Sequence, residues 1–344
     1  MMKKQNILLI YSGGTIGMAK DSDSGTLKAF DFDSLLVKIP EIRLIDCNIE
    51  TVSFENPIDS SNMNPSYWEA IARIIESHYN RVDGFVVLHG SDTMSYSASV
   101  LSFMLENLEK PVIFTGSQLP IGDLRTDAKE NLITSIQLAS LHNNGIPIIK
   151  EVCLYFEYQL YRGNRTTKMN ADHFEAFDSP NYPTLAESGV HLKINYEFLR
   201  KEKFEDDLIV RTELDTNIGV LKLFPGISEP FVESVLNAKN LKGLIIETYG
   251  SGNATTEKWF ISQLKKAIEA GLYIINVTQC SGGSVTMGQY ESSAHLKAIG
   301  VISGKDITTE AAVAKLMYLI GYNIKPEEFQ YYFEKPLRGE LKEN

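Results

Sequence analysis

Cysteine and histidine are scarce in this chain of 344 residues. The three cysteines, Cys47, Cys153 and Cys280, are odd in number, far apart and without the spacing of metal ligands. They predict reduced thiols in a reducing compartment. The six histidines are scattered, and no H-E-x-x-H pattern occurs, which disfavours zinc chemistry. We therefore expect neither a metal nor an organic cofactor.

Long apolar runs and an excess of basic residues are also missing. No run approaches the roughly eighteen apolar residues of a membrane span. The apolar stretch after Met1-Met2-Lys3-Lys4 is too short for a secretory signal, so we expect a cytoplasmic protein. The 33 lysines and arginines face 44 acidic residues, giving a net charge of −11. This balance argues against nucleic acid or an anionic membrane as partner.

What remains is typical of a globular protein, with 43% hydrophobic and 22% charged residues. The length predicts two domains. Strand and helix patterns alternate, which predicts the α/β class with two doubly wound parallel-sheet domains. We place an N-terminal catalytic domain at 1–195 and a smaller C-terminal α/β domain at 218–344. The charged segment 196–217, without apolar periodicity, is expected to connect them.

Helix signals support this organisation. Asn64-Pro65 predicts a helix start, with asparagine as the N-cap. Asp127, with Glu130 three residues later, predicts a second start through a capping box. Further elements are expected as strands at 85–88, 112–115, 152–156, 218–224, 243–247 and 273–278, and as helices at 228–238, 256–270 and, lastly, after residue 308.

Two segments place a hydroxyl beside glycine directly after an apolar run. They are residues 7–17, ending in Ser12-Gly13-Gly14-Thr15-Ile16-Gly17, and residues 85–93, ending in His89-Gly90-Ser91-Asp92-Thr93. Short apolar runs of this kind predict buried parallel strands, and ligands bind at the carboxyl ends of such strands. Thr15 and Ser91-Asp92 should therefore meet in one crevice. Two hydroxyls and a carboxylate suit nucleophilic attack on a small carbonyl substrate.

Other readings of these motifs are weaker. The glycines around Thr15 lack G-x-G-x-x-G spacing and no Walker lysine follows, which disfavours a nucleotide site. No G-x-S-x-G elbow supports an α/β-hydrolase triad. A helix-capping threonine is the structural alternative for Thr15. His89 is interpreted as a structural residue at a strand end, not as a base.

The same segments resemble the two signatures of the bacterial-type L-asparaginases, most closely the cytoplasmic type I branch. The resemblance continues in family order through Asp59-Ser60-Ser61-Asn62-Met63, Thr115-Gly116-Ser117-Gln118, Arg125-Thr126-Asp127-Ala128-Lys129-Glu130-Asn131, Arg162-Gly163-Asn164-Arg165-Thr166-Thr167-Lys168 and Ser251-Gly252-Asn253. Any one motif would be weak, but together they cover nearly the whole chain.

The resemblance implies hydrolysis of L-asparagine to L-aspartate and ammonia through a threonine acyl-enzyme. It makes Thr15 the nucleophile and places Lys168 beside Ser91 and Asp92, where it could serve as a base. Asp92 would hold Lys168, bind the substrate ammonium group, or do both.

The resemblance also implies substrate and subunit contacts. It makes Ser60 and Ser61 binders of the substrate α-carboxylate, for which turn formation is the structural alternative. It implies that Asn253 reaches the active site of a neighbouring subunit, in a homodimer or a dimer of dimers.

The chain departs from the family pattern at three places. Ser91 stands where a threonine is usual, so the methyl group that fixes the rotamer is missing. The segment 19–30, expected as a lid, lacks the usual tyrosine, and Thr26 is the nearest hydroxyl. Glu247 aligns with an arginine of the effector site in some type I enzymes, so activation by asparagine is not expected.

Three alternative functions stay open. A mixed glutaminase-asparaginase differs only by one methylene in its substrate. A non-catalytic asparagine-binding sensor would explain the missing tyrosine. The subunit of a tRNA-dependent amidotransferase is disfavoured, because it would need an additional N-terminal domain before Thr15.

Overall fold

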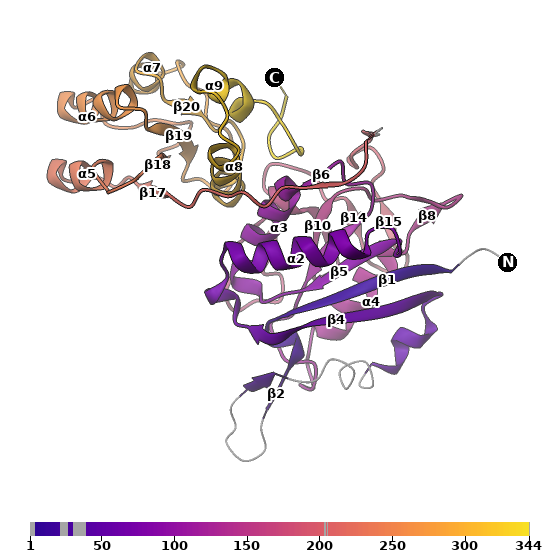
Figure 1. The fold of residues 1–344 in the computed structure, drawn as a ribbon. Helices are drawn as coiled ribbons and strands as arrows, with labels where there is room; N and C mark the ends of the chain where they lie inside the picture. The colour runs from indigo at the N-terminus through magenta and orange to yellow at the C-terminus, as the bar shows by residue number, and fades with distance from the viewer. Residues whose placement is uncertain (1–3, 21–26, 30–38, 203, 205, 344) are drawn as a thin grey trace. The chain divides into compact units, whose positions relative to one another are not determined.

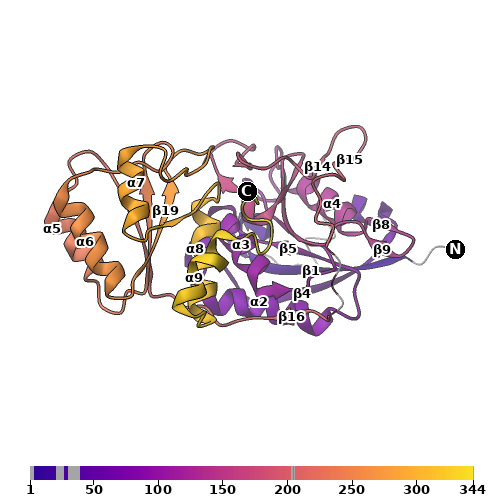
Figure 2. The same ribbon diagram turned by 90° about the horizontal axis from the view of Figure 1, so that it is seen from above.

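The computed structural model describes residues 4–20, 27–29, 39–202, 204 and 206–343. It contains two compact units, Met1–Thr212 and Glu213–Asn344, each of which can be followed in Figures 1 and 2. The break between them falls inside the segment 196–217. Part of this segment belongs to the N-terminal unit, because β16 (Ile209–Val210) pairs with β6 (Leu105–Glu106).

An eight-stranded sheet forms the centre of the N-terminal unit, in the order β15-β14-β11-β10-β7-β5-β1-β4. Five neighbouring strands are parallel, and all but the edge strand β4 have short apolar runs that are buried on both faces, as expected for a covered parallel sheet. They are β4 (Cys47–Ile58), β1 (Gln5–Gly13), β5 (Gly84–Leu88), β7 (Val112–Thr115) and β10 (Val152–Phe156).

The other edge of this sheet is antiparallel, so the prediction of a purely parallel sheet is wrong there. The strands are β11 (Gln159–Arg162), β14 (Ala186–Glu187) and β15 (Lys193–Ile194). The reason lies in the turn between β10 and β11. Glu157 and Tyr158 both have positive φ, 43° and 69°, the geometry of a tight hairpin turn that reverses the chain.

Helices cover both faces of the sheet, as predicted. Ile7 and Leu9 of β1 pack in one core cluster with Leu132 and Ile136 of α4. The residues between them on the strand point to the opposite face, where α3 contacts β7 and β10 and α2 packs beside α3 (Figure 1). The helices are α2 (Pro65–His78), α3 (Met94–Met104) and α4 (Ala128–Ala139).

The helix starts differ in how they are capped. The Asn64 side chain accepts a hydrogen bond from the Ser66 N–H, which confirms the predicted N-cap of α2. The capping box predicted for α4 is not formed: Asp127 is the N-cap residue, but its carboxylate accepts hydrogen bonds from the N–H groups of Gln118 and Leu119 instead.

The remaining elements of this unit are short. They are η1 (Thr15–Gly17), β2 (Met18–Lys20), β3 (Leu27–Ala29), η2 (Pro40–Leu44), η3 (Ser60–Asn62), η4 (Ser91–Thr93), β8 (His142–Asn143), β9 (Ile146–Pro147), η5 (Gly163–Arg165), β12 (Thr167–Lys168) and β13 (Phe177–Asp178).

The C-terminal unit is a parallel sheet in the order β17-β18-β19-β20. On one face of this sheet, Leu244 of β18 packs in one core cluster with Val232 of α5 and Phe260 of α6. The helix α8 covers the other face, where Gly243 leaves room for Leu316. The strands are β17 (Ile218–Lys222), β18 (Gly243–Thr248), β19 (Tyr273–Thr278) and β20 (Ile302–Ser303), and the helices are α5 (Glu229–Leu236), α6 (Lys258–Glu269), α7 (Glu291–Ala298), α8 (Thr309–Gly321) and α9 (Pro326–Glu334).

The α/β class and the two-domain architecture are confirmed. The helix after Thr308 is not the last one, since α9 follows it, starting at Pro326 in the first-turn position that proline favours. Among the described residues, no helix has both the length and the apolar character needed to cross a membrane.

Candidate active site

Three backbone segments of the N-terminal unit pack together without intervening side chains. Gly14 follows β1 with φ of 91°, and a Cβ atom there would lie 2.5 Å from the Gly90 nitrogen at the end of β5. A Cβ on Gly90 would in turn lie 2.5 Å from the Ser60 Oγ atom. No residue other than glycine fits at such a close approach. The glycines therefore let the backbone before Thr15 lie against the turn before Ser91, and this turn lie against Ser60.

Strand register explains this arrangement. Tyr11 of β1 is paired with Leu88 of β5, so both strands end at the same edge of the sheet. Gly13 is paired with Ile58 of β4, which leads into η3. The crevice at the carboxyl ends of parallel strands is where open α/β sheets bind ligands.

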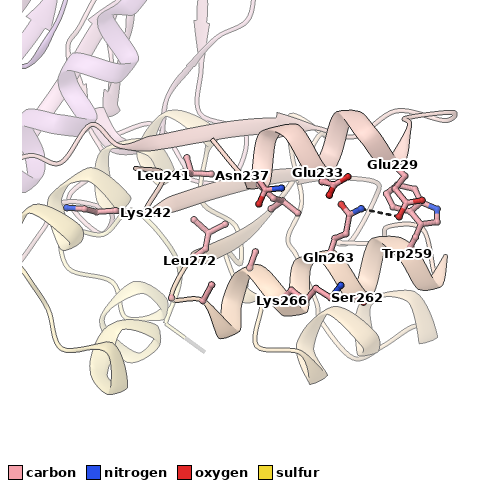
Figure 3. Close-up of a pocket in the computed structure, with 14 residues that line it drawn as sticks. Glu229, Glu233, Asn237, Leu241, Lys242, Trp259, Ser262, Gln263, Lys266 and Leu272 are labelled. Atoms are coloured by element: carbon pink, nitrogen blue, oxygen red, sulfur yellow. Dashed lines mark hydrogen bonds between the residues drawn. The ribbon is translucent and has the colours of Figure 1, made fainter. Parts of the chain in front are cut away.

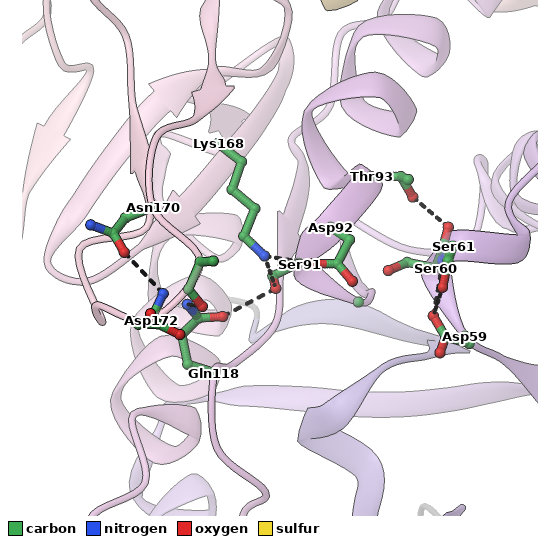
Figure 4. Close-up of polar contacts among 12 residues, drawn as sticks. Asp59, Ser60, Ser61, Ser91, Asp92, Thr93, Gln118, Lys168, Asn170 and Asp172 are labelled. Atoms are coloured by element: carbon green, nitrogen blue, oxygen red, sulfur yellow. Dashed lines mark hydrogen bonds and ion pairs between the residues drawn. The ribbon is translucent and has the colours of Figure 1, made fainter.

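Lys168 lies within reach of both polar residues after β5 (Figure 4). Its Nζ atom donates a hydrogen bond of 2.9 Å to the Ser91 Oγ atom and one of 2.6 Å to the Asp92 Oδ1 atom. The Lys168 side chain is 18% exposed, whereas that of Asp92 is 65% exposed. The lysine is therefore mostly withdrawn from water, and its carboxylate partner faces outwards.

The Ser60–Ser61 pair lies beside this group and is tied to it. The Thr93 hydroxyl donates to the Ser60 carbonyl oxygen at 2.8 Å. Ser60 is nearly buried, and Ser61 donates both its N–H and its hydroxyl hydrogen to Asp59. These hydrogen bonds hold the pKa of Asp59 below its ordinary value. Ser61 could donate to a substrate carboxylate only by exchanging this partner.

A buried chain of hydrogen bonds supports the backbone after β5. The Trp68 indole N–H donates to the Ser97 hydroxyl, whose oxygen lies 2.8 Å from His89 Nε2. His89 Nδ1 lies 2.7 Å from the Gly90 carbonyl oxygen. Because a carbonyl oxygen only accepts, His89 must carry its proton on Nδ1. Burial lowers the pKa of His89 to about 4, so the ring is neutral and both nitrogens are engaged, as expected of a structural residue.

Gln118 lies within one of the family motifs, but the sequence alone predicts no role for it. Its Oε1 atom accepts a hydrogen bond of 3.1 Å from the Ser91 hydroxyl. Gln118 follows β7, the next parallel strand beyond β5. The rule that selected Thr15 and Ser91, a polar residue just after a buried strand, could therefore have found it.

Other parts of the described chain are weaker candidates for a functional site. A pocket of about 590 Å³ lies between α5 and α6 in the C-terminal unit (Figure 3). Glu229, Glu233 and Gln263 line it, with Trp259 at one end, and none of the residues of the two signatures lies there. Among the described residues, no group of histidine, cysteine and acidic side chains could hold a metal ion.

Two family models match the chain. The model "Asparaginase, N-terminal" matches residues 6–200, and "Glutaminase/Asparaginase C-terminal domain" matches residues 217–333. The chain belongs to the L-asparaginase family. Together the two models span both units.

Individual relatives agree with this assignment. The chain is 42% identical to L-asparaginase 1 of Escherichia coli strain K12 over 341 residues, 99% of each chain. The crystal structure of L-asparaginase I from Vibrio cholerae has a TM-score of 0.90 at 39% identity and covers 99% of this chain and 100% of its own. Both names confirm the type I branch. A 60 kDa lysophospholipase of Mus musculus is 40% identical, but the match spans only 63% of that protein.

Two further residues were assigned a role from the family resemblance. Thr26 lies outside the described residues. The strands β2 and β3, which come before and after 21–26, pair in antiparallel direction. Asn253 belongs to the C-terminal unit, in a turn closed by its own backbone bonds to Tyr249. Its side chain accepts a hydrogen bond from Ser292. The roles of both stay predictions.

Proposed function

We propose that this member of the L-asparaginase family hydrolyses the side-chain amide of L-asparagine, releasing L-aspartate and ammonia. The observation that carries the proposal is the close approach of Gly14, the residue before Thr15, to Gly90, the residue before Ser91. It supports a site shared by Thr15 with Ser91, Asp92 and Lys168. The names of the E. coli and V. cholerae relatives support the same activity.

The reaction proceeds in two steps. The Thr15 Oγ atom attacks the carboxamide carbon and loses its proton, the C–N bond breaks, and ammonia leaves with that proton. Water then cleaves the ester between Thr15 and the aspartyl group. Ser91 with Lys168 either activates this water or acts as a second nucleophile.

Backbone N–H groups at the Thr15 and Ser91 turns would stabilise the oxyanion, each contributing about 3 kcal/mol. The Gly14 N–H is not one of these donors, because it donates to the Ile58 carbonyl oxygen.

The ends of the substrate have complementary partners. The Asp92 Oδ1 atom accepts from Lys168, and its Oδ2 atom would bind the substrate ammonium group. Ser60 and Ser61 would bind the α-carboxylate, the latter after leaving Asp59. Asn253 would come from a neighbouring subunit of a homodimer or dimer of dimers.

The unpaired cysteines support a cytoplasmic location, and the chemistry requires no cofactor.

A second candidate is a mixed glutaminase-asparaginase, favoured by the description of the C-terminal family model. The substrates differ by one methylene, and such a difference gives about ten- to two-hundred-fold discrimination.

The proposal predicts that Thr15→Ala and Lys168→Met each lower kcat with asparagine at least about a hundredfold, because each removes a separate group from the crevice. Ammonia release measures this. Lys193→Met is the matched control, since Lys193 is an exposed lysine on β15. Activity within tenfold of wild type in either variant, with an unchanged circular dichroism spectrum, would remove that residue from the mechanism.

A further inference from the structure

The Gln118 side chain joins the Ser91 turn to the loop that follows Lys168. Its Nε2 atom donates to the carbonyl oxygens of Ala171 and His173, at 3.1 and 2.9 Å. Its Oε1 atom faces the Ser91 hydroxyl at 3.1 Å (Figure 4). The amide thus connects two segments that are far apart in the sequence. One of them carries Ser91, and the other follows Lys168.

These contacts fix which way the amide points. Backbone carbonyl oxygens only accept hydrogen bonds, so the NH₂ end of Gln118 must face Ala171 and His173. The oxygen end can then only accept from Ser91. A serine hydroxyl has one hydrogen, and Gln118 takes it. The lone pairs of the Ser91 oxygen are therefore left for Lys168, which donates to it at 2.9 Å.

Both segments that Gln118 joins are themselves held in place. The buried Asp127 carboxylate accepts from the Gln118 N–H at 2.8 Å and from the Leu119 N–H at 3.1 Å. In the other segment, the Asn170 side chain accepts from the N–H groups of Asp172 and His173. Gln118 is thus a fixed bridge, since its backbone is anchored to the start of α4 and its amide to an ordered loop.

We propose that Gln118 is a positioning residue that holds Ser91 in the rotamer that accepts from Lys168. A threonine at this position would have a methyl group on Cβ, and β-branching restricts χ1. Serine lacks that restriction, and the bond to Gln118 replaces it. Gln118 acts on the reaction only through its hydrogen bond with the Ser91 hydroxyl. The kinetic part of this inference rests on the proposed asparaginase activity.

Kinetics of Gln118→Met test the proposal, because methionine has similar length but cannot form the three hydrogen bonds. We expect kcat for asparagine to fall roughly ten- to a hundredfold, as misplaced catalytic groups do, with KM within about twofold. In Ser91→Thr/Gln118→Met the β-methyl restores the rotamer, so most of the lost kcat should return. Gln137→Met, on an exposed position of α4, is the matched control and should match wild type.

Two results would overturn the proposal. One is wild-type kcat in Gln118→Met, and the other is a double variant no more active than Gln118→Met. If Gln118→Met fails to fold, Gln118→Ala takes its place, because alanine fits within the space of glutamine and forms none of the three side-chain hydrogen bonds. The same loss of kcat and the same recovery with Ser91→Thr are then expected.

A crystal structure of Gln118→Met separates this inference from the proposed function. The inference expects the Ser91 hydroxyl to leave its wild-type rotamer, whether or not the protein hydrolyses asparagine. An unchanged Ser91 rotamer would refute the positioning role even in an active enzyme. A wild-type protein that releases no ammonia would refute the proposed function alone.

Discussion

At the scale of single residues, the site depends on groups that carry out no chemistry themselves. His89 is fully buried and donates to the Gly90 carbonyl oxygen, which fixes the peptide that leads into Ser91. Its own position is set by Ser97 and Trp68. Catalytic groups must be held in a precise geometry, and buried partners of this kind hold the turn that carries them.

The buried His89 makes stability depend on pH. Its pKa is about 4 in the folded chain against an ordinary value of 6.5, because burial disfavours the charged ring. The stability from this group is therefore present above pH 6.5 and is lost as the pH falls towards 4. Linkage gives a loss of about 2 kcal/mol between pH 7 and pH 5.

The variant His89→Gln tests this dependence, since glutamine can donate and accept without titrating. Urea denaturation gives the unfolding free energy of each protein. The advantage of wild type over the variant should shrink by about 2 kcal/mol from pH 7 to pH 5. A difference that does not change with pH would contradict the assignment.

At this scale the sequence predicts what a local pattern determines. The strand ends before Thr15 and Ser91 were predicted because glycine follows an apolar run, and the structure confirms both strand ends. Gln118 was missed as a functional residue because its role exists only when the loop 170–173 folds back onto it. The use of Asp127 by Gln118 and Leu119 was missed for the same reason: these bonds form in the tertiary structure, and the capping pattern is local.

At the scale of elements, the turn between β10 and β11 is the clearest point of strain. Glu157 there has a positive φ of 43°. Burial, together with the nearby charges of Asp127, Glu130 and Glu175, raises its pKa to about 7. A raised carboxyl pKa means that the ionised form is disfavoured in the folded chain. Its protonation stabilises the fold at low pH, and this contribution is lost as the pH rises through 7.

Replacing Glu157 by glutamine removes this charge while keeping the shape. We expect Glu157→Gln to be more stable than wild type above pH 7 by about 1 kcal/mol, a value reduced for solvent screening. Below pH 5 the two proteins should be nearly equal. Thermal unfolding at fixed protein concentration, at pH 8 and pH 5, measures both. A variant less stable than wild type at pH 8 would contradict the repulsion.

Element prediction succeeded for the strands with continuous apolar runs and for the helices α2, α4, α5, α6 and α8. It missed β4, which has no continuous apolar run, and α3, which is buried on nearly all sides and so has no single apolar stripe. It also missed the antiparallel edge, because β14 and β15 have two residues each and carry no pattern of their own. Their pairing depends on the β10–β11 turn, whose two non-glycine residues give no turn signal.

At the scale of the whole molecule, we predict an enzyme without the effector response of some type I relatives. Glu247 lies at the end of β18, where its carboxylate accepts from the Thr309 hydroxyl at 2.8 Å and lies 3.9 Å from Lys222. An acidic side chain repels the carboxylate of an amino-acid effector, where the arginine of some relatives would attract it. Velocity should therefore follow asparagine concentration hyperbolically.

The central claim is that this chain is an enzyme whose substrate is L-asparagine. The most direct test is ammonia release by the purified full-length protein, with L-asparagine and L-glutamine measured side by side over a range of concentrations. The account predicts a hyperbolic curve for asparagine and a kcat/KM at least about tenfold above that for glutamine. Saturable binding of asparagine without ammonia release would contradict it, and would make the protein an asparagine-binding sensor instead.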